Sequence, residues 1–117
     1  MKKGNAKLVL IGLLAFTALA WLGLLKNQID SSSAYRKYLE QGQRYEEKGI
    51  YIDALESYEK ALELNSGSYD ITMKLADMYY QVGDYKGFLA CCDKAIELAP
   101  KDPQAYLKKA DYYMEKA

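Results

Sequence analysis

The chain has 117 residues, enough for one small domain, and a formal net charge of zero at pH 7. It contains no histidine, which excludes the Ser–His and Cys–His pairs of many nucleophilic enzymes. The sequence also lacks a glycine-rich phosphate loop and a cluster of metal-ligand residues. We therefore expect a protein that is not an enzyme, needs no cofactor or metal, and acts on no small-molecule substrate.

Residues 1–7 are a short basic leader, and residues 8–25 are an uncharged apolar run. As a helix, this run reaches about 27 Å, close to the thickness of the hydrocarbon core of a bilayer. The excess of lysine before the run favours a cytoplasmic N-terminus and an extracytoplasmic C-terminal part. We predict a single-pass transmembrane signal-anchor helix over 8–25 in a cell membrane. The basic Met-Lys-Lys start is typical of a bacterial envelope protein.

A cleaved signal peptide is the alternative for this segment. Ala18-Leu19-Ala20 has the small-x-small spacing of a cleavage site. However, the apolar run continues past it, and a mature chain beginning at Trp21 would expose mostly apolar residues. Trp21 also suits the interface at the far end of a span. The anchor is therefore favoured, and secretion after cleavage stays open.

Residues 26–33 are polar and rich in serine, which is typical of a short flexible linker. Alternatively, Ser32 or Ser33 is the N-cap of the helix that follows. Four of the 16 basic residues of the chain lie at the apolar run, which leaves 12 basic against 16 acidic residues beyond it, a net charge of −4. An acidic domain without a basic stripe is not expected to bind nucleic acid.

The apolar spacing after residue 33 predicts five helices, near 34–48, 52–65, 69–82, 85–98 and 103–116. Gly49 and Gly83 suit the left-handed conformation at helix ends. Asp84 is a candidate N-cap, and Asp102-Pro103 is a second helix start. The adjacent Cys91 and Cys92 do not suit a disulfide, so we expect Cys92 in the core and Cys91 at the surface or in a groove.

A period of 34 residues connects these helices. Six residues in the first copy have partners offset by this number: Tyr45, Gly49, Tyr51, Ala61, Leu62 and Leu64 recur as Tyr79, Gly83, Tyr85, Ala95, Ile96 and Leu98. The pattern resembles the tetratricopeptide repeat, a helix–turn–helix unit. The resemblance implies an all-α chain in which the transmembrane helix precedes a short helical-hairpin solenoid over 34–117. Its parts are repeats at 35–68 and 69–102 and one extra helix at 103–117.

The resemblance also indicates how the hairpins pack. Gly42 and Ala76 are expected to approach Ala54 and its equivalent closely, but that equivalent is Phe88, preceded by Gly87. Either the second hairpin opens, or Gly87 makes room. Most tyrosines fall on core positions, among them Tyr38, Tyr45, Tyr51, Tyr58, Tyr79, Tyr85, Tyr106 and Tyr113, whereas Tyr80 and Tyr112 are expected to be exposed. Either the last helix is a lid with one polar face, or the chain is the front end of a longer array.

In this family the first helix of each repeat lines a concave groove for peptides or extended protein segments. The resemblance places twelve residues there: Arg36, Leu39, Gln43, Glu46, Asp70, Met73, Asp77, Tyr80, Gln104, Leu107, Asp111 and Met114. The mixed apolar and acidic lining suits a basic or amphipathic protein segment. A clamp for a C-terminal carboxylate is rejected, because only Lys108 keeps the basic charge that it needs.

These features predict a membrane-anchored interaction scaffold or adaptor. Two alternatives remain: the N-terminal part of a larger envelope protein whose further domain carries the activity, or a secreted soluble adaptor.

Overall fold

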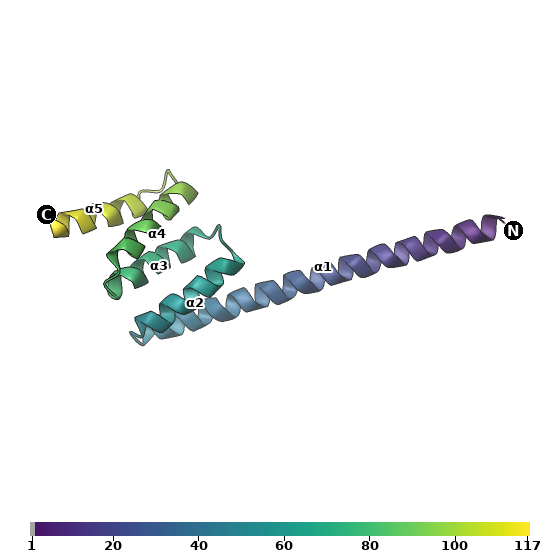
Figure 1. Ribbon diagram of the computed structural model, residues 1–117, viewed down its shortest axis with the longest axis horizontal. Helices are drawn as coiled ribbons and strands as arrows, with labels where there is room; N and C mark the ends of the chain where they lie inside the picture. Colours follow the sequence, from purple (N-terminus) through teal and green to yellow (C-terminus); the bar gives the residue numbers. More distant parts are fainter. Residues whose placement is uncertain (1) are drawn as a thin grey trace. The chain divides into compact units, whose positions relative to one another are not determined.

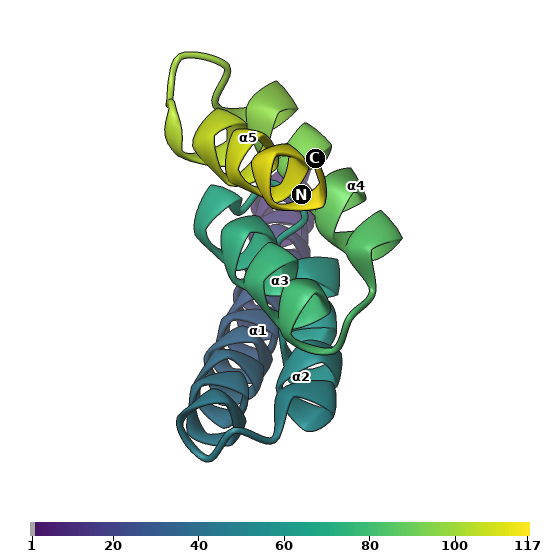
Figure 2. The same ribbon diagram turned by 90° about the vertical axis from the view of Figure 1, so that its left-hand side faces the viewer.

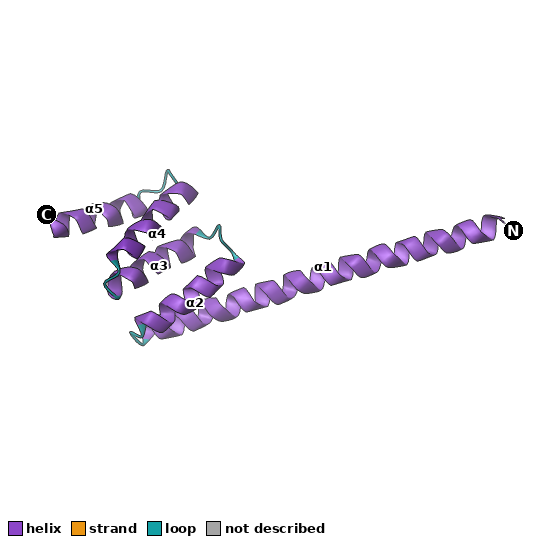
Figure 3. Cartoon of the chain, viewed as in Figure 1, coloured by secondary structure: helices purple, strands orange, loops and turns teal. Residues whose placement is uncertain are grey.

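The computed structural model describes residues 2–117, with side chains from Asn5 onward. Within this range it contains five α-helices and no strand: α1 (Lys2–Glu47), α2 (Tyr51–Leu64), α3 (Tyr69–Gln81), α4 (Tyr85–Leu98) and α5 (Gln104–Lys116) (Figure 1 and Figure 3). The all-α prediction is confirmed. The bounds of α2 to α5 lie within one residue of those expected from the sequence.

Contacts divide the chain into two units, Met1–Ser33 and Ala34–Ala117. Helix α1 continues through residues 26–33. The flexible linker expected there is therefore helical, and no helix begins at Ser32 or Ser33. The physical reason is cooperativity: the segment has no proline or glycine, and extending an existing helix costs less than ending it and nucleating another.

The second unit consists of hairpins that repeat the same turn. Gly49 and Gly83 both have a positive φ, 72° and 80°. In each turn the next N–H donates back to a tyrosine carbonyl: Ile50 to Tyr45 and Asp84 to Tyr79, both at 2.9 Å. These bonds satisfy carbonyls at the end of the preceding helix, and glycine tolerates the left-handed conformation that they require.

Side chains also fix the starts of α3, α4 and α5. Ser68 accepts from the N–H of Ile71 at 3.3 Å, and Asp84 accepts from that of Gly87 at 3.0 Å. Asp102 accepts from the N–H of Gln104 at 2.9 Å. The capping role expected for Asp84 is thus present. The carboxylate of Asp102 binds the start of α5, as its place before Pro103 indicates.

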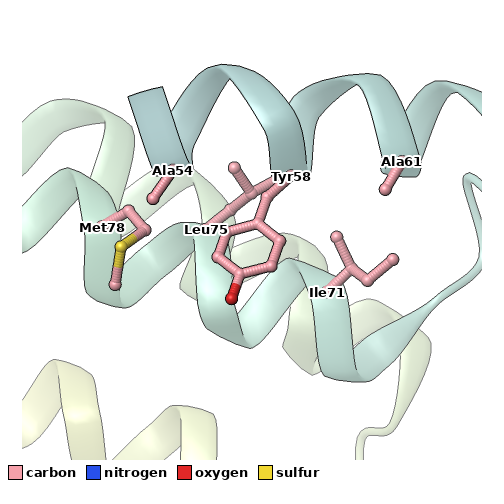
Figure 4. Close-up of a cluster of buried hydrophobic side chains, with 6 residues drawn as sticks. All are labelled: Ala54, Tyr58, Ala61, Ile71, Leu75 and Met78. Atoms are coloured by element: carbon pink, nitrogen blue, oxygen red, sulfur yellow. The ribbon is translucent and has the colours of Figure 1, made fainter. Parts of the chain in front are cut away.

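The first core lies between α2, α3 and the end of α1. Its buried members are Ala54, Tyr58, Ala61, Ile71, Leu75 and Met78 (Figure 4). Tyr58 is fully buried. A Cβ added at Gly42 would lie 2.7 Å from the ring of Tyr58. The close approach expected between Gly42 and Ala54 is therefore made to the Tyr58 ring, and only glycine leaves room for it.

The second core is smaller, and it accommodates Phe88 at a position where the repeat pattern expects a small residue. Ala76, Phe88 and Cys92 are buried together, with Phe88 only 4% exposed. The close approach is at the preceding residue, because a Cβ added at Gly87 would lie 2.6 Å from the ring of Tyr79. Gly87 therefore makes room, as in the second of the two alternatives expected from the sequence, but the bulk that it accommodates is the ring of Tyr79 and not that of Phe88.

Gly87→Ala is expected to destabilise the second unit by about 1–3 kcal/mol, because the new methyl group must displace the Tyr79 ring. The sign is informative, since Gly→Ala inside a helix normally stabilises by about 0.5–1 kcal/mol. Urea unfolding of the full chain in detergent micelles would measure the change. Gly67→Ala, in the turn between α2 and α3, is the control for an added methyl group without a clash, because a Cβ there meets no atom within 4 Å. A stabilised Gly87→Ala variant would contradict the packing described.

Four tyrosines differ from expectation. Tyr106 and Tyr113, expected in the core, are 48% and 55% exposed. Tyr80 and Tyr112, expected at the surface, are half-buried. The reason lies in the orientation of α5: the face that packs on the preceding helices is that of Ala105, Lys108 and Tyr112, which leaves Tyr106 and Tyr113 exposed.

The orientation of α5 also differs from that expected of a lid, whose polar face would point to solvent. Lys108 and Lys109 are half-buried and bind Asp77 and Asp93 on the preceding helices. In Figure 2, α3 and α5 lie on one side of the second unit, and α2 and α4 on the other. The polar face assigned to a lid thus faces the stack in part, while apolar side chains are exposed.

Candidate peptide-binding groove

The predicted groove residues lie on three helices that the structure joins side by side. Glu46 of α1 lies 3.7 Å from the Lys74 ammonium of α3, and Asp77 of α3 pairs with Lys108 of α5. Five of the twelve residues are half-buried: Leu39, Glu46, Met73, Asp77 and Tyr80. The other seven are exposed: Arg36, Gln43, Asp70, Gln104, Leu107, Asp111 and Met114.

The acidic side chains of this surface are unequal. The carboxylate of Glu46 accepts a hydrogen bond from the Tyr58 hydroxyl at 2.5 Å and also lies near Lys74. Asp77 is bound by Lys108. No ion pair is found for Asp70 or Asp111 among the side chains that the structure describes. The charge available to a partner therefore comes mainly from these two aspartates.

Two ion pairs between neighbouring hairpins follow the period of the repeat, and each is made by a lysine. Lys74 and Lys108 are 34 residues apart, and each binds a carboxylate on the first helix of the preceding hairpin. Sequence reasoning missed these bridges, although the spacing of the two lysines was a usable signal. Since all four side chains are partly exposed, each bridge contributes about 1 kcal/mol or less to stability.

A small hollow of about 170 Å³ opens between α3 and α5. Three of its seven lining residues were expected in the groove, namely Asp77, Tyr80 and Asp111. The other four are Phe88, Lys108, Tyr112 and Glu115. The hydroxyl of Tyr80 donates to the Glu115 carboxylate, so this bond connects the two helices. We call this site the α3–α5 hollow.

Aromatic rings form a cluster at the hollow, which three of them line, namely Tyr80, Phe88 and Tyr112. The ring of Tyr80 packs edge-to-face on Tyr85 and Phe88, with centroids 5.5 and 5.4 Å apart. Tyr112 lies 5.5 and 5.6 Å from the same two rings. The edge-to-face geometry of the two Tyr80 pairs is a favourable one for aromatic rings. The cluster explains why Tyr80 and Tyr112 are half-buried.

The two cysteines are placed as the sequence predicts. Cys92 is buried in the second core, and Cys91 is half-buried. Cys91 lines a second hollow together with Glu59, Leu62 and Tyr79. Burial raises the pKa of each thiol to about 11. Both thiols are therefore protonated near neutral pH, the unreactive form. Among the described side chains, no group of three or more cysteines and acids is arranged to hold a metal ion.

Alkaline pH is expected to unfold the second unit. Burial and the bond to Glu46 raise the pKa of Tyr58 above 10.0, and the bond to Glu59 and burial do the same for Tyr79. The unfolded chain releases these protons near the ordinary value of about 10. Stability is thus fully present below that pH and is lost as pH rises toward the higher folded values.

Urea unfolding at a series of pH values would measure this loss. Tyr58→Phe is the matched variant, because it removes one raised pKa and leaves the ring. Its stability should fall less steeply with pH than that of the unchanged chain. Identical slopes would show that the Tyr58 hydroxyl has no raised pKa.

The N-terminal part of α1 is a different kind of surface. Its large apolar side chains are exposed, for instance Leu14 at 69%, Phe16 at 73% and Trp21 at 66%. The helix is long and apolar enough to cross a membrane. Its most apolar stretch of 18 residues has a mean hydropathy of 2.5, and none of that stretch is buried. Length and composition alone also fit a signal sequence.

The second unit is thus an α-helical repeat domain of the class whose hairpins stack and offer one face to other proteins. The tetratricopeptide repeat family model matches residues 47–112, more than half of the chain, and the chain belongs to this family. A comparison with curated proteins gives no match. The fold of this family is that of a protein-interaction adaptor.

Proposed function

We propose that the chain is a membrane-anchored adaptor that holds an amphipathic or basic protein segment in the groove of α1, α3 and α5. The observation that supports this most is the open lining of α5. Leu107 and Met114 are 54% and 75% exposed on a folded helix, next to the exposed carboxylate of Asp111. Apolar side chains flanked by unpaired acid complement a segment with apolar and basic positions.

Site-specific photo-crosslinking in cells would test the groove. A photoreactive residue at Met114 is expected to give a discrete adduct with a partner. Ile52 on α2 is the matched control, since it is 71% exposed but lies on the other helix layer. Asp111→Lys should weaken the adduct at Met114, because it reverses a free charge and breaks no described ion pair. Equal adducts at both positions, or none at Met114, would reject the groove as the binding surface.

The apolar run 8–25 is proposed to anchor the chain, with residues 1–7 in the cytoplasm and the repeats outside. The lysines before the run support this orientation. In bacterial spheroplasts that express the chain, added protease should degrade the repeats while a cytoplasmic marker stays intact. Degradation of the repeats only after lysis would contradict this orientation and place the repeats in the cytoplasm. The intact mass of the chain from membranes distinguishes an anchor from cleavage after Ala20.

A further inference from the structure

We infer that the α3–α5 hollow is a subsite for the cationic end of one lysine or arginine side chain of the bound segment. This inference rests on the proposed groove function and gives it a chemical specificity. It also concerns residues that the predicted lining did not include, chiefly Tyr112 and Glu115. Four properties of the hollow support it: its size, its aromatic walls, its charge, and an ammonium group already held near one of its rings and over a neighbouring ring.

The size fits one side chain. At about 170 Å³ the hollow is smaller than the range of about 300–1,000 Å³ usual for sites of drug-sized ligands. Phe88, only 4% exposed, and the half-buried Tyr80 and Tyr112 line it. The aliphatic stem of a lysine or arginine would therefore contact apolar surface, as long basic side chains do where they pass over rings.

The charge around the hollow is negative. Three carboxylates line it, those of Asp77, Asp111 and Glu115, against the single ammonium of Lys108. Lys108 is already paired with Asp77. Glu115 accepts from the Tyr80 hydroxyl, but a carboxylate has further lone pairs for a second donor. A cation entering here meets two carboxylates with acceptor capacity, whereas an anion would be repelled.

The rings themselves accept a cation. The ammonium of Lys116 lies 4.2 Å from the ring centroid of Tyr85 and 5.8 Å from that of Tyr112. Such contacts stabilise a cation through the negative face of the ring. Tyr112 also lines the hollow. The chain's own lysine thus occupies the neighbouring face of the cluster, and its charge opposes a second cation close by.

A lysine probe would test the subsite without knowledge of the partner. The full chain with isotope-labelled tyrosines, in zwitterionic micelles, would be titrated with Nα-acetyl-lysine methylamide and followed by the ring signals in NMR. The signals of Tyr80 and Tyr112 should shift, while those of Tyr35 and Tyr38 stay. The same compound acetylated on its side-chain nitrogen is the neutral control. Equal shifts with both compounds, or none with the charged one, would overturn the inference.

Three variants sharpen this test. Asp111→Asn should weaken probe binding about two- to fivefold, the range for one exposed charge pair. Tyr112→Leu should weaken it about threefold or more, through the lost cation–π contact. Lys116→Gln should tighten it about twofold, because it removes a like charge. Asp53→Asn, an exposed acid on α2, is the control and should change nothing. Unchanged affinity in Asp111→Asn and Lys116→Gln would reject the subsite.

The two proposals can fail separately. Lysine binding at Tyr112 together with no adduct at Met114 would leave a cation site without a groove partner, and only the proposed function would fall. An adduct at Met114 with no lysine binding at the hollow would keep the groove and reject the subsite alone.

Discussion

Tyr58→Ala is expected to unfold the repeat domain at ordinary temperature. The side chain of Tyr58 is fully buried, and its ring fills the space between Gly42 of α1 and the core residues of α2 and α3 (Figure 4). Truncating a buried aromatic residue costs about 3–5 kcal/mol. A domain this small is expected near the lower end of native stabilities, roughly 5 kcal/mol, so the loss removes most or all of its stability.

Near-ultraviolet circular dichroism would measure this effect in the full chain. All 12 tyrosines lie between Tyr35 and Tyr113, so their signal reports the second unit rather than the apolar part of α1. The fixed environment of the rings should disappear in the Ala variant. Tyr58→Phe is the control: it keeps the ring and loses only the bond to Glu46, at a cost of about 1 kcal/mol. Equal melting of the two variants would contradict the core described.

The hairpins could be predicted from the sequence because their determinants are local. Gly49 and Gly83 end helices through their own backbone conformation, and Asp84 caps through a neighbouring N–H. Repetition at a fixed offset then identified the family. The flexible conformation predicted for residues 26–33 differs from the helix found there. The prediction used only the composition of the segment, whereas helix propagation also depends on the helical residues on both sides.

The packing of the second hairpin and the groove depends on contacts between distant residues. Sequence alone left two outcomes for Phe88, since the choice depends on where the Tyr79 ring lies against Gly87. The bridges of Lys74 and Lys108 join neighbouring hairpins, so no single helix contains them. A groove predicted from the family pattern therefore included Glu46 and Asp77 in its acidic lining, although both carboxylates already have partners in the fold.

These pairings change which substitutions test the groove. Reversing Asp77 would place two ammonium groups together between α3 and α5 and destabilise the stack, whatever its effect on a partner. Reversing Asp111 changes only a free surface charge. A loss of binding in an Asp111 variant is therefore informative about recognition, whereas the same loss in an Asp77 variant is not.

Leu14→Arg with Leu19→Arg is expected to release the chain from the membrane. Both leucines lie inside the apolar run and are 69% and 68% exposed on α1, which leaves them in contact with lipid if the helix spans a bilayer. Each arginine at the centre of a span costs about 2.5–3.5 kcal/mol. The cost of two such changes is expected to exceed the free energy of insertion that the remaining apolar residues of the run provide.

Alkaline carbonate extraction followed by flotation on a density gradient would measure the release. Ile29→Arg with Ser33→Arg is the matched control, because it adds the same charges to the same helix outside residues 8–25. The control should float with lipid and the Leu14 and Leu19 variant should not. Flotation of both would mean that the apolar run does not hold the chain in the membrane. Release of both would instead indicate that added charge anywhere on α1 is sufficient, and that residues 8–25 are not the anchor by themselves.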